Sequence, residues 1–262
     1  NSAFTHNDPQ EGHPSTVHIT TDEGNVREFI HGSRATNPVD QWPDPDVYVN
    51  YMGQSLSGSE NRNINRTYPG KADGTLTEMM SYGIVQLINT ENIDVTVDLH
   101  EASPEYPVIN ALIAHERAMN LASNVVVDMQ MEGVQISLEP SPTDLRGLTH
   151  RELGDHTDTL ALLMEAPNPA QGRLRDRTDE ALVLTGKSET YVKAGEIGQL
   201  YVPYDENGWP IEVRCARHVF GIERILANYS EMYEEPIIVT GMPSYDELVK
   251  NGMGPYLNEP TT

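Results

Sequence analysis

Hydrophobic and polar positions along the chain follow two different periods. Between residues 75 and 91, apolar residues recur at helical spacing, namely Leu76, Met79, Met80, Ile84, Leu87 and Ile88. Thr75 and Glu78 stand where a capping box would begin such a helix. From residue 93 the period changes to two, with Ile93, Val95, Val97 and Leu99 alternating with polar residues. The pattern predicts a helix followed by a strand that ends near His100.

Later segments also alternate between helix and strand patterns. Residues 15–30 enclose an Asp-Glu-Gly turn, which predicts a β-hairpin. We expect helices over 114–130, 188–200 and 215–229, and a short apolar strand within 157–167 that ends at Glu165 and is stopped by the following Ala-Pro. Strands that alternate with helices of this length are typical of an α/β sheet with helices on both faces. We therefore predict one α/β domain spanning residues 1–262.

Composition excludes several functional classes. The chain carries 40 acidic residues against 17 Lys and Arg, a net charge of −23. A nucleic-acid partner is not expected, because binding to phosphates requires the opposite charge. No apolar run reaches the roughly 18 residues of a membrane span, so no membrane partner is expected either. Cys215 is the only cysteine, which excludes an internal disulfide and a cysteine-based zinc cluster.

Two residues with catalytic chemistry end two of the predicted strands. His100 closes "VTVDLH" and Glu165 closes "LALLME". Ligands of α/β sheets bind beyond the carboxyl ends of the strands, so we expect both side chains at one edge of the sheet. A histidine there can bind zinc, and a glutamate can serve as a general base. Each residue alone is also compatible with an ordinary polar or solvated position.

The stretch "NRNINRTYPG", residues 61–70, combines two arginines with three asparagines in a turn. Arg62 and Arg66 keep their charge at any relevant pH and can grip a carboxylate through two parallel hydrogen bonds. A guanidinium can also stabilise an oxyanion. The alternative is a surface loop with scattered charge. The polar run 141–157 predicts a solvated connection.

At this point the chain resembles a known family. "NINRTYPG" resembles the Asn-Arg…Pro-Gly signature of zinc carboxypeptidases, "VDLHEA" the strand with a zinc-binding histidine, and "LLMEAPNP" the strand with the catalytic glutamate. Arg66 and His100 are 34 residues apart, and His100 and Glu165 are 65 apart. These intervals are nearer the compact succinylglutamate desuccinylase/aspartoacylase branch. The resemblance covers roughly residues 60–230. It also implies an alternative to the solvated connection over 141–157, because in the resembled family this interval carries a loop that closes on substrate.

The resemblance implies a fold, an activity and a set of roles. The fold would be a three-layer α/β/α sandwich around a mixed, mostly parallel sheet. The activity would be zinc-dependent cleavage of an amide bond beside a free carboxylate, in a peptide C-terminus or an N-acyl amino acid. Asn65 and Arg66 would hold that carboxylate, Arg62 would polarise the scissile carbonyl, His100 would bind Zn²⁺, and Glu165 would activate water.

One part of the family pattern is missing. The family supplies its first two zinc ligands from an H-x-x-E motif, yet none of the nine histidines has Glu three residues later. Either His6 binds the metal together with Asp8 or Glu11, or the motif lies upstream of residue 1 in a segment that this chain lacks. We expect the second. Two further alternatives are a pseudoenzyme that has lost the metal and a carboxylate-binding protein without catalysis.

Overall fold

The computed structural model describes residues 15–20, 26–31, 45–177, 179–234 and 236–256. The chain divides into two compact units. Unit 1 comprises Asn1–Thr96 and Pro142–Ala161, and unit 2 comprises Val97–Ser141 and Leu162–Thr262. The expectation of a single domain over residues 1–262 remains a prediction. Within the described ranges, no helix is both long enough and apolar enough to cross a bilayer.

Unit 1 contains two small antiparallel sheets and two helices. The predicted hairpin is confirmed, with β1 (Ser15–Thr20) paired to β2 (Val26–His31). A second pair joins β3 (Val47–Val49) to β4 (Ser55–Ser57). Two 3₁₀ turns follow, η2 (Gly58–Arg62) and η3 (Ile64–Arg66). The arginine-rich stretch therefore folds as tight turns.

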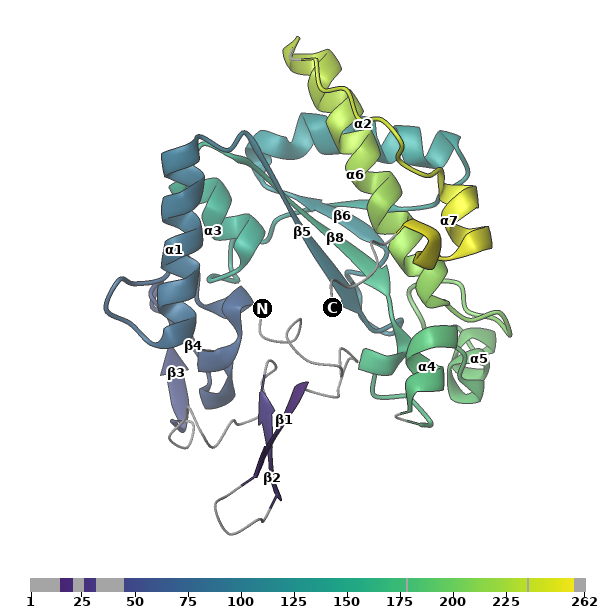
Figure 1. Cartoon of the computed structure of the whole chain (residues 1–262), viewed down its shortest axis with the longest axis horizontal. Helices are drawn as coiled ribbons and strands as arrows, with labels where there is room; N and C mark the ends of the chain where they lie inside the picture. The colour runs from purple at the N-terminus through teal and green to yellow at the C-terminus, as the bar shows by residue number, and fades with distance from the viewer. Residues whose placement is uncertain (1–14, 21–25, 32–44, 178, 235, 257–262) are drawn as a thin grey trace. The chain divides into compact units, whose positions relative to one another are not determined.

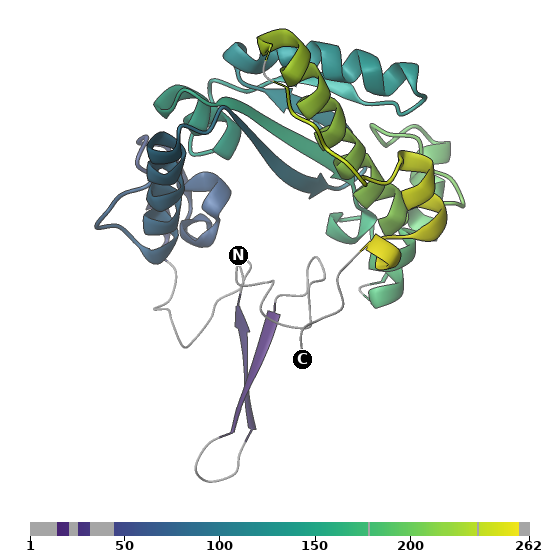
Figure 2. The ribbon, with the colours of Figure 1, turned by 45° about the horizontal axis from the view of Figure 1, so that its top comes forward.

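The two helices of unit 1 share one hydrophobic core. α1 (Leu76–Glu91) and α3 (Thr149–His156) lie side by side (Figure 2). Val85 and Ile88 of α1 pack with Leu153 of α3, and Tyr68 and Ala161 complete the cluster. Apolar contacts therefore join the segment after the 3₁₀ turns to the segment before the last strand.

A mixed four-stranded sheet has the order β5-β8-β6-β7 (Figure 1). Its strands are β5 (Val95–Ala102), β6 (Ala111–Ala114), β7 (Ser137–Pro140) and β8 (Leu160–Pro167). β6 pairs with β7 in parallel and with β8 antiparallel. β8 is a continuous apolar run that is almost fully buried, as expected for an inner strand. The predicted α/β class with a mixed, mostly parallel sheet flanked by helices is thus confirmed.

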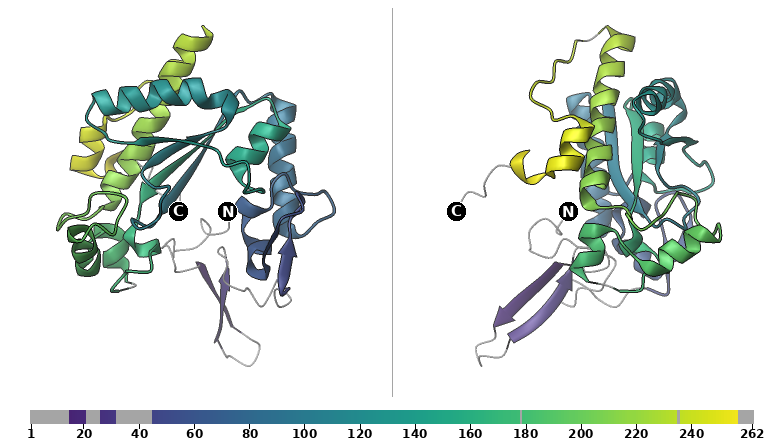
Figure 3. Two further views of the ribbon diagram at one scale, coloured as in Figure 1. Left: turned by 180° about the vertical axis from the view of Figure 1, so that it is seen from behind. Right: turned by 90° about the vertical axis from the view of Figure 1, so that its right-hand side faces the viewer.

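Helices of unit 2 pack against this sheet and against one another. α2 (Met119–Met131) and α6 (Ile211–Tyr233) match the expected helices, and α6 runs along one face of the sheet (Figure 3). Gly221 lets α6 approach closely, because a Cβ there would lie 2.2 Å from the Cε of Met164 on β8. α7 (Tyr245–Asn251) lies beside α6, with the rings of Tyr245 and Phe220 6.0 Å apart. The smaller helices are α4 (Glu180–Thr185) and α5 (Glu189–Glu196).

The helix over α1 was predicted correctly, but most of its regularly spaced apolar residues are exposed. The capping box of Thr75 and Glu78 is present as expected. Leu76, Met79, Met80 and Leu87 are nevertheless exposed, and the buried positions are Glu78, Ser81, Val85 and Ile88. At two of these positions a polar side chain can be buried because it has a hydrogen-bond partner. Glu78 accepts a hydrogen bond from Tyr48, and the Ser81 hydroxyl bonds that of Thr67.

One of the two predicted strand ends requires correction. β5 ends at Ala102, near His100 as predicted, whereas β8 continues past Glu165 to Pro167. Leu99 was expected on a uniformly apolar face, yet it is 45% exposed. β5 stands last in the sheet order, so among the described strands it has a neighbour on one side only. An edge position explains why its residues are half-buried.

Thr75→Ala tests the capping of α1. The Thr75 side chain accepts a hydrogen bond from the Glu78 main-chain N–H. Loss of an N-cap typically lowers stability by about 1 kcal/mol. We expect this decrease in the free energy of unfolding, measured by urea denaturation. Thr77→Ala in the same turn is the matched control and should change that free energy by less than about 0.5 kcal/mol. Equal values for the two variants would contradict the capping role.

Candidate active site

Pairing of β5 with β8 sets the first feature of the candidate site. Leu160 donates its main-chain N–H to Asp94 O at 2.7 Å, and Asn168 donates to Ala102 O at 2.8 Å. From the first bond to the second, the residue numbers rise by eight in both strands, so the strands run parallel. His100 and Glu165 therefore lie near the same ends of neighbouring strands. His100 Nδ1 is 3.8 Å from Glu165 Oε1, which confirms that the two side chains meet at one edge of the sheet.

Glu165 is a buried carboxylate. Its side chain is 14% exposed, and Oε2 is buried without a hydrogen-bond partner among the described residues. Burial raises the pKa of Glu165 to about 7, because the charged form loses solvation. His100 opposes this shift, and the nearby acids Asp98 and Glu101 add to it. A carboxyl with this pKa can both accept and release a proton near neutral pH.

His100 is held from two directions. Its Nε2 lies 2.9 Å from Asp98 Oδ2, and Asp98 precedes it by two residues on the same face of β5. From α6, the His218 side chain hydrogen-bonds the backbone of His100. Burial lowers the pKa of His218 to about 4, so this ring is neutral at pH 7. The Nε2 contact leaves His100 Nδ1 on the side of Glu165.

An ion pair between β5 and α6 supports the ends of β5 and β8. Glu101 follows His100, so its side chain points to the opposite face of β5. There it pairs with Arg214 of α6, which is 1% exposed. Glu101 Oε2 also accepts a hydrogen bond from Asn168 Nδ2 at 2.8 Å. This network ties the ends of β5 and β8 to α6.

Unit 1 holds the residues expected to bind a carboxylate. Arg66 is half-buried, and the one hydrogen bond from its side chain to a described residue runs from Nη1 to the neighbouring Asn65 O at 2.7 Å. Asn65 Oδ1 accepts hydrogen bonds from Thr149 N and Oγ1, at 2.7 and 2.8 Å. The Asn65 amide is thereby oriented, and its Nδ2 donor forms no bond to a described residue. Arg62 lies at the end of η2 and is half-buried.

The described residues do not complete a zinc site. Among them no group of three or more His, Cys, Asp or Glu side chains is arranged to hold a metal ion. His100 is a plausible single ligand, because a carboxylate behind an imidazole is the usual support of a metal-binding histidine. His6, the other candidate, lies outside the described residues, as do Asp8 and Glu11. The described residues therefore supply one of the three protein ligands that catalytic zinc requires.

Sequence reasoning missed several residues around these candidates. The segment 141–157 was expected to be a solvated connection, and this expectation was wrong, because α3 has six buried residues and Glu152 is 0% exposed. Its charged side chains are buried because they pair with one another. Asp98 could have been found from its spacing of two from His100. No local signal marks His218 or Arg214, since their roles depend on how α6 packs against β5.

The raised pKa of Glu165 makes stability depend on pH. Its folded pKa, about 7, lies above the ordinary 4.5, so folding favours the protonated form. That stabilisation is complete below pH 4.5 and is lost as pH rises through 7. Relative to Glu165→Gln, the chelator-treated native chain should therefore lose roughly 3 kcal/mol of unfolding free energy between pH 4 and 8. Glu91→Gln, at an exposed position, is the control. Parallel stability curves for native chain and Glu165→Gln would contradict the shifted pKa.

Comparison of the chain with protein-family models, with curated proteins and with solved structures finds no match.

Proposed function

We propose that this chain is a zinc-dependent hydrolase that cleaves an amide bond next to a free carboxylate. One observation carries the proposal, the placement of the Glu165 carboxylate. It is buried, it lies 3.8 Å from His100, and its Oε2 has no hydrogen-bond partner among the described residues. A structural carboxylate in such a place would normally be satisfied by hydrogen bonds, since an unpaired buried acid costs stability.

Glu165 would act as a general base and then as a general acid. In the first step its carboxylate takes a proton from the water that attacks the scissile carbonyl. In the second step it returns that proton to the leaving amine nitrogen. A pKa of about 7 suits both steps, because the two protonation states are then similarly populated at neutral pH. The Asp98 contact would keep the His100 ring oriented toward Glu165.

Asn65 and Arg66 would recognise the free carboxylate of the substrate. The resemblance gives them this role, and two observations support it. The Arg66 guanidinium has no acidic partner among the described residues, and Nδ2 of the adjacent residue, Asn65, forms no hydrogen bond to any of them. A guanidinium and an amide N–H together match the two oxygens of a carboxylate. N-acyl amino acids and peptide C-termini both carry such a group next to an amide bond.

Zinc dependence and the zinc-carboxypeptidase-like fold are parts of this proposal that come from the resemblance. His100 would supply one ligand, and the remaining ligands would come from outside the described residues. We assign the proton transfers to Glu165 alone and no step to a metal. Arg62, from the same resemblance, would stabilise the developing oxyanion.

A carboxylate-binding protein without catalysis is the second candidate. The observation that favours it is the position of the Asn65 and Arg66 donors in unit 1, where their hydrogen bonds involve only unit 1 residues. Metal analysis separates the two candidates. About one zinc per chain supports the hydrolase, and binding of a carboxylate ligand without zinc supports the binding protein.

Glu165→Gln tests the general base. Gln keeps the shape of the side chain and removes its ability to accept the proton. We expect kcat on an N-acyl amino acid or peptide substrate to fall by at least 10²-fold, the usual contribution of general-base catalysis. Metal content and thermal stability at pH 5 should remain near those of the native chain. A kcat within threefold of the native value would remove Glu165 from the mechanism.

Arg66→Lys tests carboxylate recognition. Lysine keeps the charge but cannot form the two parallel hydrogen bonds of a guanidinium. We expect KM for a carboxylate substrate to rise about tenfold, which corresponds to the loss of one charge-assisted hydrogen bond. The same substrate with its carboxylate amidated should be cleaved poorly by both proteins. An unchanged KM and kcat would place Arg66 outside the substrate site.

A further inference from the structure

We infer that residues 146–149, anchored by Glu152, are a positioning element that presents Asn65 and Arg66 to a carboxylate. We call residues 146–149, Arg-Gly-Leu-Thr, the support segment. The inference rests on the proposed function and adds residues to it. The hydrogen bonds used below join described residues that all belong to unit 1.

The support segment fixes the side chain of Asn65. Thr149 begins α3, and its main-chain N–H donates to Asn65 Oδ1 at 2.7 Å. Its hydroxyl donates to the same oxygen at 2.8 Å. Two donors on one carbonyl oxygen determine which way the amide faces. The Nδ2 donor must then point away from Thr149, which is the orientation that a carboxylate ligand requires.

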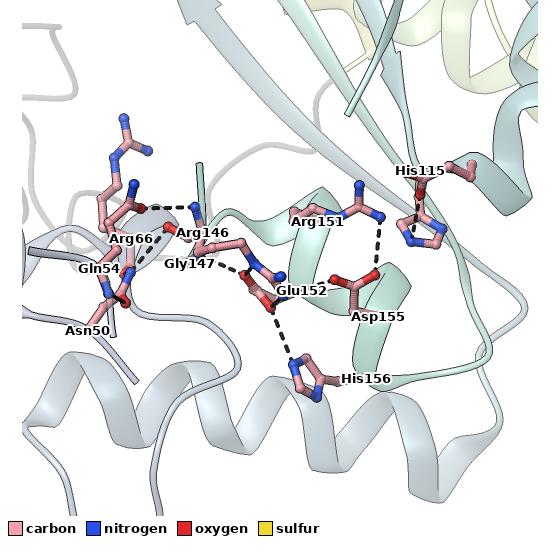
Figure 4. Close-up of polar contacts among 11 residues, drawn as sticks. Asn50, Gln54, Arg66, His115, Arg146, Gly147, Arg151, Glu152, Asp155 and His156 are labelled. Atoms are coloured by element: carbon pink, nitrogen blue, oxygen red, sulfur yellow. Dashed lines mark hydrogen bonds and ion pairs between the residues drawn. The ribbon is translucent and has the colours of Figure 1, made fainter. Parts of the chain in front are cut away.

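The support segment also fixes the main chain of Arg66. Gly147 has φ +88° and packs directly on the Arg66 carbonyl, where a Cβ would lie 2.2 Å from the oxygen. Asn50 Nδ2 donates to both Arg66 O and Arg146 O at 3.2 Å, so one amide bridges the two backbones. Tyr68 N donates to Gly147 O at 3.3 Å. The backbone on both sides of Arg66 is therefore held, while its guanidinium points away from the network (Figure 4).

Glu152 anchors the support segment from inside α3. Its Oε1 accepts hydrogen bonds from Arg146 Nε at 2.7 Å and from Gly147 N at 2.8 Å. Its Oε2 pairs with Arg146 Nη2 at 2.7 Å and lies 3.3 Å from His156 Nε2. Figure 4 shows these contacts converging on Glu152. A fully buried carboxylate with this many donors is rigid, because release of any donor would leave buried charge unsatisfied.

The arrangement has a functional consequence beyond stability. The network satisfies Asn65 Oδ1, Arg66 O and the Thr149 N–H. Among the described residues it leaves Asn65 Nδ2 without an acceptor, and of the Arg66 guanidinium only Nη1 is bonded, to Asn65 O. Donors that are held in place before the ligand arrives bind it more tightly, because less side-chain entropy is lost on binding. Thr149 is thus a positioning residue for the carboxylate, since it acts on the ligand through Asn65.

Thr149→Val is the decisive variant. It keeps the size of the side chain and the main-chain N–H, and it removes only the hydroxyl that orients Asn65. Thr149→Ser, which retains the hydroxyl, is the matched control. The probe is N-acetylglycine, and its uncharged analogue N-acetylglycinamide is the control ligand. Binding is followed by NMR of the ¹⁵N-labelled chain, at the Arg66 Nε–Hε and Asn65 Nδ2 signals.

We expect the native chain and Thr149→Ser to bind N-acetylglycine with Kd values within twofold of each other, and the amide analogue not at all. Thr149→Val should bind N-acetylglycine about fivefold more weakly, the effect of one neutral hydrogen bond. Its Asn65 Nδ2 signals should show averaging over more than one rotamer. Chain folding is checked from the backbone amide spectrum of each variant.

Two other results would overturn the inference in distinguishable ways. If Thr149→Val binds N-acetylglycine as tightly as the native chain, Thr149 has no positioning role and carboxylate recognition by Arg66 still stands. If the native chain binds acid and amide alike, or neither, at Asn65 and Arg66, carboxylate recognition in the proposed function fails and the support segment serves stability alone.

Discussion

Parallel pairing of β5 with β8 is the constraint on which the candidate catalytic residues depend. The pairing bonds at both ends of the two strands hold their register, so His100 and Glu165 become neighbours. The same pairing buries Glu165, because β8 lies between β5 and β6 in the sheet. Removal of water then raises the pKa of Glu165 toward 7. A slip of one residue in this register would send one of the two side chains to the opposite face and abolish the contact.

The sequence predicted those parts of the fold that are governed by local rules. The cap of α1 follows from two residues three positions apart, and the α1 helix and the β1–β2 hairpin were found for similar reasons. The apolar spacing does not identify the buried face of α1, because the sequence does not show that Tyr48 and Thr67 satisfy Glu78 and Ser81. Those partners come from other segments. Periodicity identified the helix, whereas tertiary contacts decided which side of it is buried.

The residues of the candidate site also differ in whether local sequence rules could identify them. His100 and Glu165 could be found because each ends a recognisable apolar run. Glu152 and Thr149 could not, since their polar segment has the composition of a solvated loop. Their burial depends on mutual satisfaction: Glu152 binds Arg146 and the Gly147 N–H, and Thr149 binds Asn65. A buried polar network of this kind has no one-dimensional signature, because each member is stable only in the presence of the others.

The strong negative charge of the chain gives Arg66 its significance. With 40 acidic residues against 17 basic ones, most arginines would be expected to find a carboxylate within the protein. Arg146 and Arg214 do so, through Glu152 and Glu101. Arg66 forms no such pair among the described residues, although its backbone is held firmly. Under the proposed function, this guanidinium binds the carboxylate of the substrate.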